Sequence, residues 1–147
     1  MAPDDARPAE RSARDVQDWP LGLLWVGVAV AVLAMVAPYV GPGLNTAASA
    51  EVADHVVPGA AILLVSTAML VLARSPRAPS PTLLLAAGLL VCLAGLWMVL
   101  THIPLLSQAN RGEAPWPGAI WHTLSACVAL GFGVVWAAGA WGELGDR

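Results

Sequence analysis

Four stretches of the chain contain no charged residue and consist mainly of apolar side chains. They have 20, 18, 18 and 22 residues and cover Leu21–Val40, Val56–Ala73, Leu83–Leu100 and Ala119–Ala140. A bilayer core about 30 Å thick requires about 20 helical residues, each rising about 1.5 Å. Backbone groups in lipid must form their hydrogen bonds within the segment, so helices are the expected form. The pattern predicts four transmembrane helices.

The first stretch also resembles a secretory signal peptide, because arginines precede it. Its apolar part is longer than the roughly 7–15 residues typical of such a signal. We therefore expect it to remain in the protein as a membrane helix. Residues 1–18, rich in Pro, Ala, Asp and Arg, are predicted to form a disordered tail. Residues 19–141 form the predicted transmembrane domain, and residues 142–147 a short second tail.

The low content of charged residues indicates a membrane protein, and the distribution of arginines indicates its orientation. Only 12% of the 147 residues are charged, about half the share in a soluble domain, and no basic block suits nucleic acid. The first tail holds three arginines, the loop Arg74–Pro81 holds two and the last tail holds one. The other two loops, Gly41–Asp54 and Ile103–Pro117, hold only Arg111. The positive-inside rule then predicts a multi-pass protein of a bacterial plasma membrane with both termini in the cytoplasm.

The two halves of the chain follow a similar order. Each has a helix that ends near a proline, then a loop, then a histidine that opens the next helix. Pro38 precedes His55 by 17 residues, and Pro104 precedes His122 by 18. This predicts an all-α four-helix bundle of two tandem helical hairpins, repeat one at 19–73 and repeat two at 82–141. Hairpins in tandem give parallel repeats, whereas alternating-access transporters more often use inverted ones.

Short motifs at the same places resemble the SPW-repeat family of bacterial integral membrane proteins. The unit of that family has Ser-Pro-Trp near the end of its first helix and Trp-Asn at the start of its second. Here Ala37-Pro38-Tyr39 and Ile103-Pro104-Leu105 stand for the first motif, and Ala53-Asp54-His55 and Trp121-His122 for the second. The resemblance implies the duplicated architecture and carries no activity.

Tryptophans and cysteines receive structural interpretations. The tryptophans near the helix ends are expected to lie at the headgroup level, where the indole N–H stays hydrated. On the inner side these are Trp19, Trp136 and Trp141, and on the outer side Trp97, Trp116 and Trp121. Cys92 and Cys127 have no CxxC partner, and buried cysteine commonly behaves as a small hydrophobe.

Small residues recur every fourth position along the last helix. Ser125, Ala129, Gly133 and Ala137 share one face, which allows close backbone approach between membrane helices. The face is predicted to pack on protein, either within the monomer or in a homo-oligomer. The other expected partners are the lipid bilayer and further membrane proteins.

Candidate chemistry is confined to three histidines. The four stretches carry no Asp, Glu, Lys or Arg, which argues against a pump or an ion path, and no catalytic motif occurs. His55, His102 and His122 belong at outer helix ends, where three imidazoles have the chemistry to bind a metal ion or haem iron. Glu51, Asp54 and Glu113 are the carboxylates available nearby, although Asp54 is also placed to cap a helix. We expect the three rings to face headgroups or loop carbonyls separately.

The favoured interpretation is a small non-enzymatic membrane protein of structural or accessory type, with no cofactor. The alternative is an outer-face metal- or haem-binding protein that uses His55, His102 and His122.

Overall fold

The computed structural model describes residues 8–41, 51–76 and 79–145, and for residues 8–20 it describes only the backbone. Its elements, in order, are α1 (Pro8–Val40), the π-helical turn η1 (Val52–Val56), α3 (Val57–Ala73), α4 (Pro81–Asn110) and α5 (Trp116–Gly145). The described residues contain no strand. The predicted all-α helical bundle is therefore confirmed.

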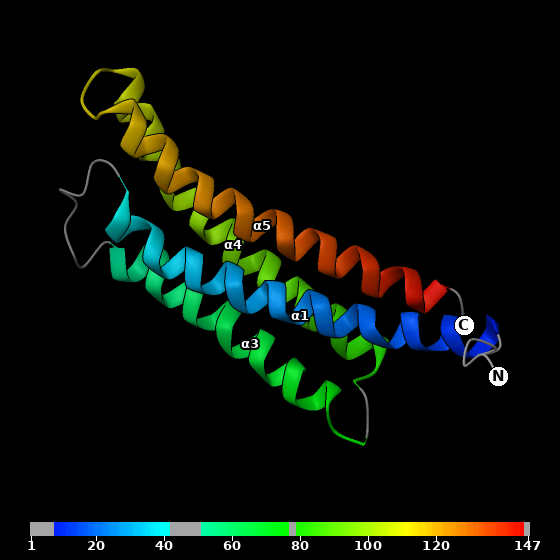
Figure 1. The fold of residues 1–147 in the computed structure, drawn as a ribbon. Coiled ribbons are helices and arrows are strands. Elements are labelled where there is room, and N and C mark those ends of the chain that lie inside the picture. Colours follow the sequence, from blue (N-terminus) through cyan, green and yellow to red (C-terminus); the bar gives the residue numbers. More distant parts are fainter. Residues whose placement is uncertain (1–7, 42–50, 77–78, 146–147) are drawn as a thin grey trace, which may run out of the picture.

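The four long helices run alternately up and down the bundle (Figure 1). The start of α1 and the end of α5 lie at one end, and the α4–α5 turn lies at the other. The most extensive contact joins α4 to α5, followed by that of α1 with α3, while α3 with α4 and α1 with α5 complete the bundle. Whether the halves descend from one duplicated unit stays a prediction.

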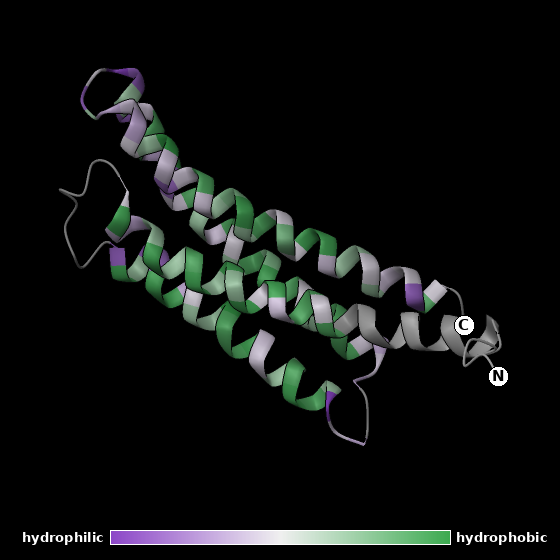
Figure 2. Cartoon of the chain, viewed as in Figure 1, coloured by the Kyte–Doolittle hydropathy of each residue, from purple (hydrophilic) through white to green (hydrophobic). Residues whose placement is uncertain are grey.

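The outer surface of the bundle is apolar along the middle of the helices. Leu64, Leu93 and Val135 are 72%, 62% and 60% exposed, and each lies well inside a helix that is long and apolar enough to cross a membrane. Figure 2 shows apolar positions along all four helices and a cluster of polar residues at the α4–α5 turn. So large an apolar surface is unfavourable in water, and we conclude that this is a multi-pass membrane protein.

Glycines allow the backbones of α4 and α5 to lie almost in contact. A Cβ atom added at Gly133 would lie 2.6 Å from the backbone nitrogen of Cys92, and one at Gly88 would lie 2.8 Å from that of Ala137. Ser125, Ala129 and Gly133 are buried and Ala137 is half-buried. The small-residue face of α5 thus includes positions packed on α4 within the monomer.

The helices α4 and α5 extend beyond the predicted apolar stretches. α4 continues through Pro104 to Asn110, where a loop over Ile103–Pro117 was expected. An internal proline removes only one helical hydrogen bond, and the residues that follow, Leu105 to Ala109, favour helix. α5 already begins at Trp116 with Pro117 in its first turn, where the missing N–H has no helical acceptor to lose.

The turn between α4 and α5 explains where the former ends. Gly112 has a φ of 74°, which residues with a side chain rarely adopt. Its N–H donates to Ala109 O at 3.1 Å, and that of Glu113 donates to Gln108 O at 2.9 Å. This Schellman arrangement satisfies the last carbonyls of α4.

Two further predictions differ from the structure. α1 begins at Pro8, so residues 8–18 are helical where a disordered tail was expected, and their Ala, Arg, Glu and Gln content favours helix; residues 1–7 lie outside the described part. Trp136 is buried rather than at a headgroup boundary. Its ring meets that of Phe132 edge-on with centroids 5.7 Å apart, because apolar burial outweighs the interfacial preference of indole here.

Candidate metal centre

Three helical elements bring His55, His102 and His122 together inside one end of the bundle. The side chains come from η1, α4 and α5 and are 0%, 4% and 2% exposed. Ring centroids lie 4.6 Å apart for His55 and His102, 5.4 Å for His55 and His122, and 6.0 Å for His102 and His122. One nitrogen from each ring falls in a set within 4.8 Å. The expectation that the rings face headgroups or loop carbonyls separately is therefore wrong.

The position of His55 depends on a widened turn before Pro58. The proline ring clashes with the carbonyl four residues earlier, that of Asp54, and has no N–H to give it. In the structure the N–H of Val57 bonds Val52 O, five residues back, and the residues between form η1. Such π turns occur often at functional sites. Within this turn His55 is buried, whereas Val52 and Ala53 are exposed.

A second proline leaves a backbone carbonyl free to accept a hydrogen bond from the His55 ring. Because Pro38 lacks an N–H, the carbonyl of Ala34 has no helical donor from four residues ahead. The Nδ1 atom of His55 lies 3.2 Å from that carbonyl oxygen. A carbonyl can only accept, so Nδ1 carries the proton and donates. The lone pair of this imidazole is then on Nε2.

His102 has the same tautomer for a different local reason. Its Nδ1 lies 2.5 Å from Met98 O, one turn earlier in α4. The neighbouring hydroxyl of Thr101 also donates to Met98 O, at 3.0 Å, so its proton is not available to the ring. Nδ1 of His102 therefore donates to the carbonyl, and its lone pair is also on Nε2.

The two lone pairs face each other. Nε2 of His55 and Nε2 of His102 are 2.9 Å apart, a distance at which two acceptors repel unless a proton or a metal ion lies between them. Ligating histidines usually donate their other N–H to a carbonyl or carboxylate, which orients the ring toward the metal. Both rings donate Nδ1–H to a carbonyl oxygen, so the pair has the hydrogen bonding that is typical of histidines bound to a metal.

His122 and Glu51 complete the cluster. Nδ1 of His122 and Nε2 of His55 each lie 3.7 Å from Oε2 of Glu51. Both Nε2 of His122 and Oε2 of Glu51 are buried without a hydrogen-bond partner among the described residues. Ser125 donates to the His122 carbonyl at 2.8 Å and so supports the backbone at this point of α5. One imidazole nitrogen and one carboxylate oxygen therefore lack a hydrogen-bond partner and are available as metal ligands.

The other two candidate carboxylates have different surroundings. Arg111 donates to both oxygens of Glu113, at 2.8 Å and 2.9 Å, and this pairing lowers the pKa of the exposed Glu113 carboxyl. Asp54 is half-buried. The structure assigns Asp54 to the interior of η1, and the cap residue of that turn is Glu51. Glu51 is the carboxylate that reaches the histidines.

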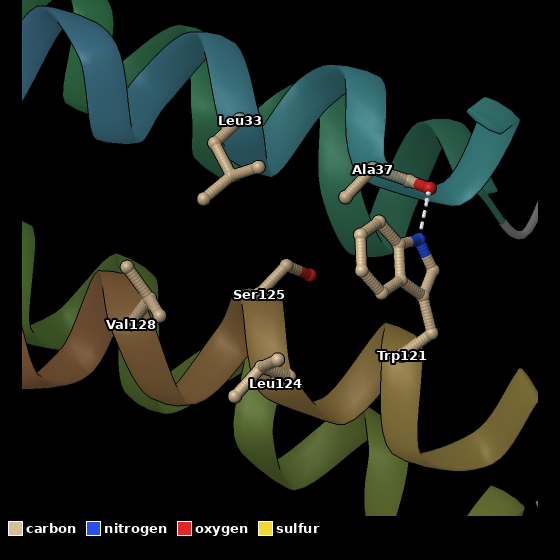
Figure 3. Close-up of a pocket in the computed structure, with 6 residues that line it drawn as sticks. All are labelled: Leu33, Ala37, Trp121, Leu124, Ser125 and Val128. Carbon is tan, nitrogen blue, oxygen red and sulfur yellow. Dashed lines mark hydrogen bonds between the residues drawn. The ribbon is translucent and has the colours of Figure 1, made fainter. Parts of the chain in front are cut away.

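A small crevice lies beside the cluster, between α1 and α5. Its volume is about 90 Å³ and it is lined by Leu33, Ala37, Trp121, Leu124, Ser125 and Val128. Figure 3 shows the Trp121 indole across its end, where Nε1 donates to Ala37 O at 2.7 Å. Ala37 lies in the last turn of α1, whose carbonyls have no helical donor. The crevice is almost entirely apolar, and Trp121 separates it from the end of the bundle.

Sequence reasoning named the three histidines, and it named Glu51 as one of three available carboxylates without choosing among them. It did not identify the carbonyl supports. Ala34 and Met98 have no side-chain chemistry, so no residue type marks them. The usable signal for Ala34 was Pro38 four residues later, since a proline inside a helix always leaves one carbonyl without its donor.

Comparison with protein-family models, with curated proteins and with solved structures gives no match to this chain. The resemblance to the SPW-repeat family therefore stays a prediction.

Proposed function

We propose that this membrane protein binds one transition metal ion through His55, His102 and His122. The observation that carries the proposal is the 2.9 Å approach of two Nε2 atoms whose Nδ1 atoms are both engaged with carbonyl oxygens. Imidazole nitrogen is a preferred ligand of Zn, Cu, Fe and Ni. Buried polar groups of this kind are otherwise unfavourable in an apolar interior.

The spacing suits a bare ion. Four ligands at 2.0–2.1 Å from zinc lie roughly 3.3 Å from one another. The Nε2 atoms of His55 and His102 are 2.9 Å apart, and one nitrogen from each of the three rings falls in a set within 4.8 Å. Movements of about 1 Å bring these nitrogens to the spacing of zinc ligands. A porphyrin plate has no room among rings whose centroids are 4.6–6.0 Å apart. Of the two sequence-based possibilities, a metal ion is supported and a haem is not.

The orientation is part of the proposal. The arginine distribution favours both termini in the cytoplasm of a bacterium, and the histidines lie toward the other end of the bundle, so the ion would be held near the outer face of the plasma membrane. Reporter fusions after Arg147 and in the loop between α1 and η1 test this. A periplasmic signal from the C-terminal fusion would contradict it.

The test of function is metal content. Protein purified in detergent and stripped with a chelator is loaded with Zn²⁺ or Cu²⁺, separated from free ions and measured by mass spectrometry of the metal. We expect one ion per chain, and loss of it in the His55→Ala, His102→Ala, His122→Ala triple variant. A matched control is Asp54→Asn, which changes a polar residue of the same turn and should keep the ion.

The second candidate is the structural or accessory, non-enzymatic protein favoured by the sequence. It is supported by the His55 contact with Ala34 on α1 and with His102 on α4, which ties three helices together. If folded wild-type protein takes up none of these ions, a proton joins the two Nε2 atoms, the cluster is an interhelical hydrogen-bond network, and this second candidate replaces the first.

A further inference from the structure

Among the residues that the structure describes, Glu51 is the acidic residue whose side chain points into the histidine cluster. It precedes η1, four residues before His55, and its side chain is 8% exposed. Its Oε2 atom lies 3.7 Å from a nitrogen of His55 and 3.7 Å from a nitrogen of His122. Both distances exceed that of a hydrogen bond, and Oε2 has no such bond to any described residue.

A carboxylate in this environment requires a positive partner. Buried charges in proteins are paired or coordinate metals, because an isolated ionised group in an apolar medium is strongly unfavourable. Arg111, which follows α4 at this end of the bundle, is paired with Glu113 instead. One of the two histidines beside Glu51, His55, also belongs to the pair whose Nε2 atoms lie 2.9 Å apart, so a cation at this point would satisfy the carboxylate and the imidazoles together.

The turn that positions His55 also positions Glu51. Both residues are buried, while the intervening Val52 and Ala53 are exposed. The i, i+4 pair thus points to the inside of the bundle from one short segment. The other two histidines, His102 and His122, come from α4 and α5.

We infer that Oε2 of Glu51 is a fourth ligand and makes the site selective for divalent over monovalent ions. The inference rests on the proposed function. Three neutral imidazoles alone carry no charge, whereas an added carboxylate offers a hard, negative oxygen. Borderline divalent ions such as Zn²⁺ and Co²⁺ accept mixed nitrogen and oxygen ligands, while Cu⁺ and its analogue Ag⁺ favour soft sulfur ligands.

The experiment compares Glu51→Gln with wild type in binding Zn²⁺, Co²⁺ and Ag⁺ by competition with chelators of known affinity. The amide keeps the size of the side chain and removes its charge. We expect Zn²⁺ and Co²⁺ to bind at least about 100-fold more weakly and Ag⁺ to change much less. The matched control is Glu113→Gln, an exposed carboxylate outside the cluster, which should bind all three ions as wild type does.

A second measurement covers the case in which Glu51→Gln does not fold. Wild-type protein labelled with ¹³C-glutamate is compared by infrared difference spectroscopy with and without Zn²⁺. A zinc-dependent shift of a labelled carboxylate band is expected. No shift, or a folded Glu51→Gln protein that keeps the wild-type affinity and ion preference, overturns the inference and leaves the histidine site intact. Failure of wild type to bind any of the ions overturns the proposed function and this inference with it.

Discussion

The Nδ1 atom of His55 lies 3.2 Å from the carbonyl oxygen of Ala34. That carbonyl is available because residue 38, four positions later, is proline and has no N–H to donate. A proline in α1 therefore determines which nitrogen of a histidine 17 residues further along the chain carries the proton. The free lone pair of His55 points at His102 as a consequence.

Pro38→Ala should weaken metal binding although it removes no ligand. The new N–H can bond Ala34 O as in an ordinary helix, and it competes with the His55 ring for that oxygen. Loss of such an orienting contact typically lowers metal affinity about 10–100-fold. Zinc affinity measured by chelator competition should fall into that range, while helix stability should not decrease.

Pro104→Ala is the control for this change. It removes a proline from the interior of α4 near the same end of the bundle, but the carbonyl it would re-engage, that of Leu100, is not among the acceptors used by the three imidazoles. Its zinc affinity should match wild type. Equal affinity of Pro38→Ala and Pro104→Ala would refute the role assigned to Pro38.

Trp121→Phe should lower stability by about 1 kcal/mol, the net value of a typical intramolecular hydrogen bond. The indole Nε1 donates to Ala37 O at 2.7 Å and so joins α5 to α1. Unfolding in mixed detergent micelles gives the free energy. Trp116→Phe is the matched control, because Trp116 is exposed at the start of α5, and its unfolding free energy should stay within about 0.5 kcal/mol of wild type.

Ser66→Ala should leave stability unchanged or raise it. The hydroxyl of Ser66 is fully buried and has no hydrogen-bond partner among the described residues, and burying such a group costs about 1–3 kcal/mol. Ser125→Ala is the comparison, since its hydroxyl donates to His122 O at 2.8 Å. A loss of stability in Ser66→Ala as large as that in Ser125→Ala would show that the Ser66 hydroxyl has a partner after all.

The fold followed from the sequence because the bilayer imposes a simple rule. Charge-free stretches of 18–22 residues have few forms available in lipid, and the first of them, Leu21–Val40, agrees with the membrane span of α1. The extent of α4 did not follow, because Pro104 and the polar residues after it read equally well as a loop. At a membrane surface, water and lipid headgroups permit either form, so helix propensity decides.

The residues of the site could be predicted from the sequence, but their convergence could not. Residue type identified His55, His102 and His122, but their convergence depends on side-chain direction, and this depends on the π turn before Pro58. A regular α-helix has one residue fewer in each hydrogen-bonded turn and would turn His55 and Glu51 to a different angle. The spacing of apolar residues does not reveal that extra residue, and Pro58 is the one sign of it in the sequence.

The contact of α4 with α5 gives a prediction with an internal control. Gly131 and Gly133 lie in the same part of α5, but a Cβ atom at Gly131 would meet nothing within 4 Å, whereas one at Gly133 would lie 2.6 Å from the backbone of Cys92. Gly131→Ala should therefore raise the free energy of unfolding by up to about 1 kcal/mol through helix propensity. Gly133→Ala should lower it by about 1–3 kcal/mol, because backbone atoms cannot move aside as a side chain can.

The same pair of variants separates packing within the monomer from packing between copies. If Gly133 packs on α4 of its own chain, the loss of stability in Gly133→Ala is independent of the protein-to-detergent ratio, because unfolding is then unimolecular. An effect that grows as the protein is diluted in micelles would place the small-residue face in an oligomer. The contacts of Gly88 with Ala137 and of Gly133 with Cys92 join the same two helices at several turns, and we expect the concentration-independent result.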